Sequence, residues 1–396
     1  MQSDSPALPL AHITVVAVEQ AVAVPYATRQ LADLGARVIK IERPGSGDFA
    51  RGYDTTVLGQ SSYFVWLNRG KESVALDLKQ PRGLAVLHRL IAGADVYLQN
   101  LAPGAAARLG IDARTLAGRY PDLVAGDLSG YGSAGPWRHR KAYDLLIQCE
   151  TGLVELTGPA ESAARAGISI ADVAGGMYTL TGVLAALAAR EHTGHGGSFE
   201  VSLLDSLAEW LGQPIHFTDG SGEPPPRTGL AHPSISPYGP YPAADGNVMI
   251  AVQNDREWRR FCTEVLKDPA LADRPEFATN PARVAARTAL DTAITQVTSA
   301  LTTRELTGRL DAAEIANGKI NHVADFLDHP QLTARQRWHE VSTPAGVTRA
   351  LAPPVIYHDA PPPPMPPVPA AGEHTAAVLA EFGLSPDEIS AVRGQD

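Results

Sequence analysis

The chain of 396 residues is poor in cysteine, lysine and long hydrophobic runs. Its two cysteines, Cys149 and Cys262, cannot form a disulfide framework and lack the spacing of a metal site, so we expect a reduced, cytoplasmic setting and no metal. No run of about 20 apolar residues is present, and Met1 to Leu10 has no signal-peptide pattern, so we expect no membrane association. Acidic residues outnumber basic ones by 43 to 33, which argues against a nucleic-acid partner.

What the chain does contain is a hydrophobic fraction of 44%, enough for the cores of two or three domains. In the first third, short β-branched runs alternate with helical patterns. Strands are expected over residues 12–19, 37–42, 74–78, 96–98 and 123–128, and helices over 25–34 and 83–94. This alternation predicts parallel βαβ units and therefore an α/β fold with a doubly wound parallel sheet.

The composition changes after the first region. A glycine- and proline-rich stretch at 219–226 indicates a linker, and the strand and helical patterns beyond it predict a smaller α+β domain. Residues 360–369 form a semi-rigid proline-rich segment, followed by two short helices. We therefore expect the large domain to comprise 1–218 and 331–396, and the linker and small domain to comprise 219–330.

The first strand–helix junction lacks the glycine fingerprint of dinucleotide-binding proteins. Residues 19–25 read Glu-Gln-Ala-Val-Ala-Val-Pro, whereas a pyrophosphate needs glycines for close approach of the backbone. The sequence therefore disfavours an NAD enzyme.

Asp172 is the most informative candidate residue. It lies between an apolar run and two glycines, Gly175 and Gly176, which we expect to open a helix. A helix N-terminus stabilises a carboxylate, and glycines let a ligand approach the backbone. An ordinary helix cap is the alternative. The apolar surroundings favour a poorly hydrated carboxylate that can act as a nucleophile.

Three other segments carry weaker signals. The glycine loop at 129–136 follows a strand, where α/β sheets bind ligands. Lys141 and Tyr143 open an apolar helix, and Arg108 follows the loop at 99–104. Ordinary loop, first-turn and cap chemistry is the alternative for each of them.

Taken together, these segments resemble the family III CoA-transferases over nearly the whole chain. The matching motifs lie at 19–25, 34–48, 68–79, 99–104, 129–132, 171–176, 182–187 and 372–375. That family includes formyl-CoA transferase, carnitine CoA-transferase, dicarboxylate transferases that use succinyl-CoA or mesaconyl-CoA, and the α-methylacyl-CoA racemases. The resemblance is greatest to the dicarboxylate transferases.

The resemblance implies roles for individual residues. Asp172 falls on the nucleophile that forms aspartyl anhydride and aspartyl-CoA thioester intermediates, and backbone amides at Gly175 and Gly176 are candidate oxyanion donors. The CoA-binding positions fall on Ala23, Arg43, Leu76, Lys79, Asn100, Leu101, Arg108 and Lys141. The four cations among them suit the phosphates of CoA, and two of the six lysines in the chain are included. Acyl-CoA and a small carboxylic acid would be substrates, with no permanently bound cofactor.

The resemblance also implies the architecture. Family members have a large Rossmann-like domain built from both chain ends and a small domain from the middle. Two chains interlock as a homodimer, with the linkers of each passing through the other.

Two departures from the family pattern concern the substrate. Residues 232–241 replace a glycine-rich flap with a stiffer, more polar segment, in which His232 could pair with a substrate carboxylate or be a plain loop histidine. Tyr143 stands where the racemases have a histidine, and a phenol is a poor base at neutral pH. A CoA-transferase is therefore favoured, with a 2-methylacyl-CoA racemase or an inactive CoA-binding protein as alternatives.

Overall fold

The computed structural model describes residues 8–359 and 362–393 in two compact units. The larger unit comprises the chain up to Thr151, Ala166–Gly212 and the chain from Gln331 onward. The smaller comprises Gly152–Arg165 and Gln213–Pro330. Residues 1–7, part of the segment without a signal-peptide pattern, and residues 360–361, part of the proline-rich segment, lie outside the described residues.

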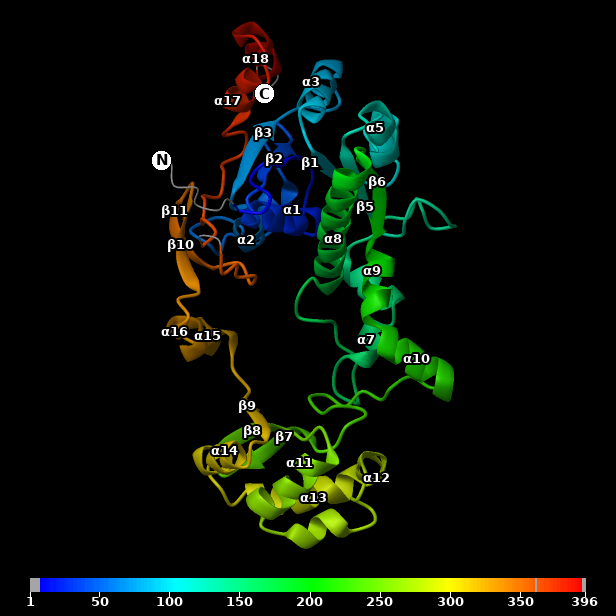
Figure 1. The fold of residues 1–396 in the computed structure, drawn as a ribbon, viewed down its shortest axis with the longest axis vertical. Helices are drawn as coiled ribbons and strands as arrows, with labels where there is room; N and C mark the ends of the chain where they lie inside the picture. Colours follow the sequence, from blue (N-terminus) through cyan, green and yellow to red (C-terminus); the bar gives the residue numbers. More distant parts are fainter. Residues whose placement is uncertain (1–7, 360–361, 394–396) are drawn as a thin grey trace. The chain divides into compact units, whose positions relative to one another are not determined.

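A six-stranded parallel sheet forms the centre of the larger unit (Figure 1). Its strand order is β3-β2-β1-β4-β5-β6. The strands are β1 (Thr14–Val18), β2 (Arg37–Glu42), β3 (Lys71–Ala75), β4 (Val96–Gln99), β5 (Val124–Ser129) and β6 (Gly197–Ser202). Their side chains are mostly buried on both faces, as in a sheet covered by helices on each side. The predicted α/β fold with a parallel sheet is therefore confirmed.

Helices cover the two faces of this sheet. The helical elements of the larger unit are α1 (Ala23–Asp33), the 3-10 turn η1 (Phe49–Gly52), α2 (Ser62–Asn68), α3 (Pro81–Ala92), α4 (Ala105–Leu109), α5 (Ala113–Arg119), α6 (Asp144–Glu150), α8 (Ile170–Thr193), α9 (Leu203–Trp210), α17 (Thr375–Glu381) and α18 (Pro386–Arg393). Apolar side chains of α3, α5, α17 and α18 join one face of the sheet in a single core. On the other face α1 and α8 pack against each other.

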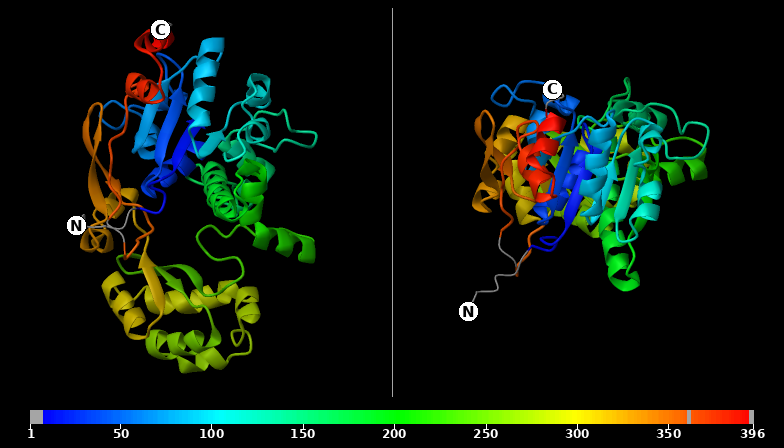
Figure 2. Two further views of the ribbon diagram at one scale, coloured as in Figure 1. Left: turned by 45° about the horizontal axis from the view of Figure 1, so that its top comes forward. Right: turned by 90° about the horizontal axis from the view of Figure 1, so that it is seen from above.

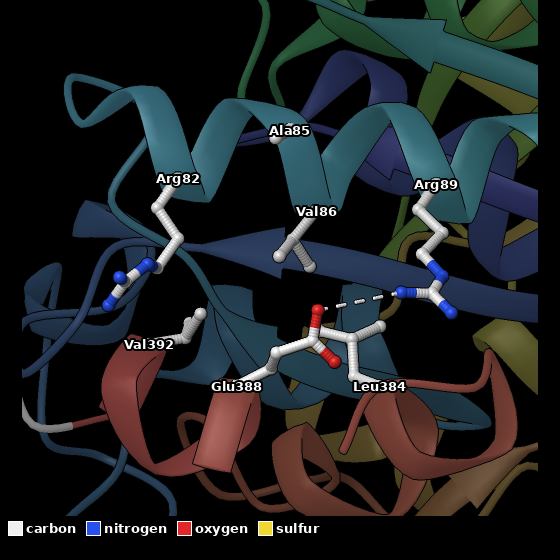
Figure 3. A pocket seen from close by; sticks show the side chains of 7 residues that line it. All are labelled: Arg82, Ala85, Val86, Arg89, Leu384, Glu388 and Val392. Carbon is white, nitrogen blue, oxygen red and sulfur yellow. Dashed lines mark ion pairs between the residues drawn. The ribbon is translucent and has the colours of Figure 1, made fainter. Parts of the chain in front are cut away.

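The C-terminal helices therefore belong to the larger unit. α17 lies beside β3, the edge strand (Figure 2). A shallow groove separates α18 from α3 (Figure 3), with Arg82 and Arg89 on one side and Glu388 on the other. Arg89 and Glu388 form an ion pair at 3.9 Å, and Arg82 donates to the Ala391 carbonyl at 3.5 Å, so both arginines of the groove have partners in the chain.

Helix α8 is long and apolar enough, by length and composition alone, to cross a membrane. It packs against α1, α9 and the strands β5 and β6, as the central helix of a folded domain does. The sequence pattern predicts a long apolar helix here, over about 176–190. The helix instead starts at Ile170.

Two smaller sheets complete the fold. In the larger unit β10 (Trp338–Thr343) and β11 (Gly346–Leu351) form an antiparallel hairpin. In the smaller unit β7 (Tyr238–Ala243), β8 (Gly246–Ala251) and β9 (Ala316–Lys319) form an antiparallel sheet. The hairpin was missed because a two-stranded ribbon with half-exposed side chains has little hydrophobic alternation.

The core of the smaller unit includes Trp258 of α11 and Phe261 of η2, and η3, α13 and α14 contribute to it. The helical elements of this unit are α7 (Leu153–Leu156), α10 (Gly212–Ser221, whose first residue falls in the larger unit), α11 (Asp255–Arg260), the π-helical η2 (Phe261–Leu266), the 3-10 turn η3 (Pro269–Asp273), α12 (Asn280–Ala285), α13 (Arg287–Thr298), α14 (Thr303–Ala312) and α15 (Val323–Leu327), with α16 (Pro330–Ala334) at the boundary between units. The expected linker at 219–226 thus starts inside α10. The mostly helical pattern over 281–301 corresponds to two helices, α12 and α13.

Candidate active site

Asp172 lies in the first turn of α8, and the N-terminus of this helix is capped by Asp144, a residue of another helix. One carboxylate oxygen of Asp144, the residue that begins α6, accepts hydrogen bonds from the amides of Ala171 at 2.8 Å and Asp172 at 3.2 Å. Its other oxygen accepts from the side-chain amide of Gln148 at 2.7 Å. Asp172 is therefore not the cap of its own helix, and the ordinary-cap alternative is wrong. The sequence contained Asp144 beside Tyr143 but gave no sign of this long-range bond.

The carboxylate of Asp172 is half-buried and makes no hydrogen bond or ion pair with any residue that the structure describes. Burial, with a smaller contribution from the negative charge of Asp144, raises its pKa to about 7. Such a carboxylate is poorly solvated when ionised, which makes it both costly to the fold and reactive toward an electrophile.

Gly175 and Gly176 lie in the second turn of α8, where their amides belong to the helical hydrogen-bond ladder. The expectation that they open the helix and offer free oxyanion donors is therefore wrong. Their role is close packing. A Cβ on Gly176 would lie 2.6 Å from the carbonyl oxygen of Ala23, and one on Gly175 would lie 2.6 Å from a methyl of Leu203.

Two phenols lie near Asp172. Tyr143 immediately precedes the capping Asp144 and is 65% exposed. Tyr53, which follows η1, was not anticipated from the sequence; burial, together with the negative charges of Asp48 and Asp172 among others, raises its pKa to about 12. Both hydroxyls are uncharged donors at neutral pH. The nearby motif at 34–48 could have drawn attention to the turn that carries Tyr53.

The other predicted residues of the larger unit lie mainly where its parallel strands end. Arg43 follows β2, Leu76 and Lys79 follow β3, and Asn100 and Leu101 follow β4. β1 lies between β2 and β4, so the sheet reverses its strand order there, the usual ligand-binding position of open α/β sheets.

Asn100 holds the loop after β1. Its side-chain oxygen accepts from the Gln20 amide at 2.9 Å, and its side-chain nitrogen donates to the Gln20 carbonyl at 2.9 Å. Both polar atoms of the side chain are thereby bonded to Gln20, so Asn100 fixes the loop after β1 at this edge of the sheet. The side chains of Ala23 and Leu76 are buried beneath the edge, and that of Leu101 is half-buried.

The four predicted cations are all exposed and form no ion pair with any described residue. They are Arg43, Lys79, Arg108 and Lys141. In contrast, Lys40 and Lys71 are buried and both paired with Glu19. Exposed cations without an ion-pair partner are free to pair with an anionic ligand.

His232 lies in the smaller unit. Its Nδ1 accepts a hydrogen bond from the Ser234 amide at 3.1 Å, and its ring stacks on Tyr238. Burial and the nearby charge of Arg287 lower its pKa. These contacts favour a neutral imidazole, so pairing with a substrate carboxylate would have to use a neutral N–H.

Within the described residues, no group of three or more His, Cys, Asp or Glu side chains could hold a metal ion.

Comparison with known proteins gives this site its context. The sequence profile of CoA-transferase family III matches residues 10–375. A succinate–glutarate CoA-transferase of Agrobacterium fabrum is 34% identical over 94% of this chain and 96% of its own length. An acetyl-CoA:oxalate CoA-transferase of Acetobacter aceti is 36% identical over 78% of this chain and 80% of its own.

The fold agrees with these sequence relationships. The crystal structure of a CAIB/BAIF family protein from Brucella suis superposes with a TM-score of 0.81 at 33% identity, covering 95% of this chain and all of that one. The match extends over almost the whole chain in both sequence and fold, and it shows the family to which the chain belongs. The chain belongs to CoA-transferase family III and is a CoA-transferase.

Proposed function

We propose that Asp172 is the covalent nucleophile that carries CoA between two carboxylic acids. The observation that carries this proposal is the unpaired, half-buried carboxylate of Asp172 beside the phenols of Tyr53 and Tyr143. A buried carboxylate without a partner destabilises the protein, and its reactivity gives a reason for its presence.

The reaction proceeds through four acyl transfers. The ionised Asp172 attacks the thioester carbonyl of the acyl-CoA donor, the C–S bond breaks, and an aspartyl anhydride and a CoA thiolate form. The thiolate attacks the aspartyl carbonyl, which releases the donor acid as its carboxylate and leaves CoA as a thioester on Asp172. An acceptor carboxylate then attacks this thioester and displaces the thiolate. The thiolate attacks the acceptor's acyl carbon, giving the new acyl-CoA and free Asp172.

Each tetrahedral intermediate carries an oxyanion that needs hydrogen-bond donors. The amides of Ala171 and Asp172 are already bonded to Asp144, and those of Gly175 and Gly176 lie inside α8. We assign the donor role to the hydroxyls of Tyr53 and Tyr143. The high pKa of Tyr53 keeps its proton in place throughout the cycle.

Arg43, Lys79, Arg108 and Lys141 pair with the phosphates of CoA in this proposal, because they are exposed and have no anionic partner among the described side chains. Ala23, Leu76, Asn100 and Leu101 shape the edge on which the CoA lies. CoA is thus a substrate held by charge, with no cofactor retained between turnovers.

Dicarboxylic acids are the first substrate class to test, since relatives carry names such as succinate–glutarate CoA-transferase. The electrostatic surroundings of Asp172 include no basic side chain from the described residues. A second substrate carboxylate would therefore have to find its donor elsewhere, and His232 of the smaller unit stays a candidate. The racemase alternative would need a base at Tyr143, whose phenol is a poor one near pH 7.

The protein acts as an interlocked cytoplasmic homodimer in this proposal, with domains at 1–218 plus 331–396 and at 219–330. Large apolar side chains of the larger unit are more than a third exposed in the single chain, namely Leu145, Leu146, Leu184 and Trp210. A second copy would cover them. Mixing tagged and untagged dimers under native conditions tests the interlock, because rapid appearance of mixed dimers would contradict it.

Trapping of the intermediate tests the nucleophile directly. Incubation with an acyl-CoA donor followed by hydroxylamine should convert Asp172 to its hydroxamate, which peptide mass spectrometry locates. Asp172→Asn should show neither the hydroxamate nor CoA transfer. Labelling of a different residue, or full transfer by Asp172→Ala, would refute the proposal.

A further inference from the structure

Residues 366–375, here called the C-terminal strap, run along the open edge of β3. The amide of His374 donates to the Ser73 carbonyl at 2.9 Å, and the Ser73 amide donates to Nδ1 of His374 at 3.2 Å. The amide of Ala75 donates to the hydroxyl of Thr375 at 3.0 Å. These bonds satisfy an edge strand that would otherwise present free backbone groups. They also account for the motif at 372–375, which the proposed chemistry does not use.

The hydroxyl of Ser73 connects the strap to a buried carboxylate. It accepts from the Gly372 amide at 2.8 Å and donates to Glu42 at 2.6 Å. Glu42 also accepts two bonds from Arg51, at 2.7 and 2.8 Å, and one from the amide of Asp48 at 2.7 Å. Burial opposes ionisation of Glu42, but these donors and Lys40 lower its pKa to about 2, so all four bonds are made to a charged acceptor.

Arg51 also bonds to the C-terminal strap, and it belongs to η1, the turn that Tyr53 follows. Its Nη1 donates to the Pro369 carbonyl at 3.2 Å, and its guanidinium lies 3.7 Å from the centre of the Phe64 ring. Arg51 belongs to η1, and Tyr53 is the residue directly after that turn.

The ring of Tyr53 packs against the aromatic rings of two neighbouring elements. It packs against Phe49 of η1, with centroids 5.7 Å apart, and edge-on against Tyr63 of α2 at 5.5 Å. Arg51 joins those same two elements, since it belongs to η1 and stacks on Phe64 of α2. Tyr53 follows η1, and its amide donates to the Ala50 carbonyl at 3.3 Å, so the position of Tyr53 depends on where η1 lies.

We infer that Ser73, Glu42 and Arg51 form a positioning chain through which the C-terminal strap holds Tyr53 in place beside Asp172. This inference rests on the proposed role of Tyr53 as an oxyanion donor. Ser73, Glu42 and Arg51 touch no reacting atom, and they act by fixing where the phenol of Tyr53 lies.

Ser73→Ala tests the chain, and Thr375→Val is its matched control. Both variants remove a side-chain bond between the strap and β3, but only Ser73→Ala breaks the link to Glu42. Hydrogen exchange read by mass spectrometry should show faster exchange of the peptide covering residues 47–53 in Ser73→Ala and wild-type exchange there in Thr375→Val. Arg51→Lys removes the paired bonds between Arg51 and Glu42, and it should have the same effect on exchange as Ser73→Ala. It replaces Ser73→Ala in the experiment if that variant folds poorly.

Transfer kinetics give the second readout. Ser73→Ala should lower kcat about tenfold, with little change in the KM for acyl-CoA, whereas Thr375→Val stays near the wild type. In a Tyr53→Phe background, Ser73→Ala should have almost no further effect on kcat. An equal loss in both backgrounds would overturn the inference.

The exchange experiment does not depend on activity. Unchanged exchange at residues 47–53 in both Ser73→Ala and Arg51→Lys would overturn the positioning chain even if Asp172 is the nucleophile. A wild-type protein in which Asp172 forms no covalent intermediate would refute the proposed function, and the exchange result would still decide whether the strap holds the turn.

Discussion

Asp172→Asn should stabilise the protein above neutral pH while abolishing CoA transfer. The wild-type carboxylate is half-buried without a partner, and burial raises its pKa from 3.8 to about 7. Asparagine has nearly the same shape and no charge to desolvate. The reactive group is therefore expected to reduce the stability of the fold that carries it.

The magnitude follows from the pKa difference of about 3 units, each worth about 1.4 kcal/mol, or about 4 kcal/mol in all. Between pH 4 and 7 the unfolded chain releases this proton while the folded chain keeps it, so the stability of the wild type falls as the pH rises. Above pH 7 the whole cost is present. Because solvent reaches one side of Asp172, we expect a gain of about 2 to 4 kcal/mol at pH 8.

Denaturant unfolding at pH 8 and pH 4.5, at one fixed protein concentration, measures this difference. Asp172→Asn should exceed the wild type at pH 8, and the gap should narrow to about 1 kcal/mol or less at pH 4.5, where the unfolded chain has released most of this proton. Asp122→Asn, at an exposed carboxylate of the same unit, is the control and should change stability little at either pH. A variant no more stable than the wild type at pH 8, or a gap as wide at pH 4.5 as at pH 8, would refute the reasoning.

Three further substitutions and one control test the proposed site and the buried ion pairs of the larger unit. Tyr143→Phe should lower kcat by about ten- to a thousandfold with acyl-CoA binding retained, and an unchanged kcat would assign this exposed ring no part in the reaction. Lys79→Ala should raise the KM for acyl-CoA more at low salt than at high salt, since its exposed ammonium pairs with a phosphate, and a KM effect independent of salt would contradict that pairing. Glu19→Gln should cost about 3 to 5 kcal/mol of folding stability, because it leaves the buried ammonium of Lys71 without its carboxylate. Glu381→Gln, at an exposed ion pair, should cost less than about 1 kcal/mol, so similar losses in both variants would argue against a buried network.

Much of the larger unit could be predicted from local pattern. Runs such as 37–42 and 96–98 are short, β-branched and bounded by turn residues, and the structure has strands there. A strand buried on both faces is mostly apolar, so the sequence records it directly, although β2 also buries the paired charges of Lys40 and Glu42. The hairpin formed by β10 and β11 is half-exposed and carries no comparable signal.

The sequence by itself singled out Asp172, because a carboxylate among apolar residues and glycines already limits the chemistry it can perform. The four cations were identified by the resemblance to family III CoA-transferases, and their charge agrees with that role. The sequence could not show that Asp144 caps α8, that the amides of Gly175 and Gly176 lie inside the helix, or that Tyr53 lies near Asp172. Each of these facts depends on which distant segments the fold brings together. Whether a carboxylate is paired, and hence whether it is stable or reactive, is decided only by the tertiary structure, because its solvation depends on neighbours that are remote in the chain.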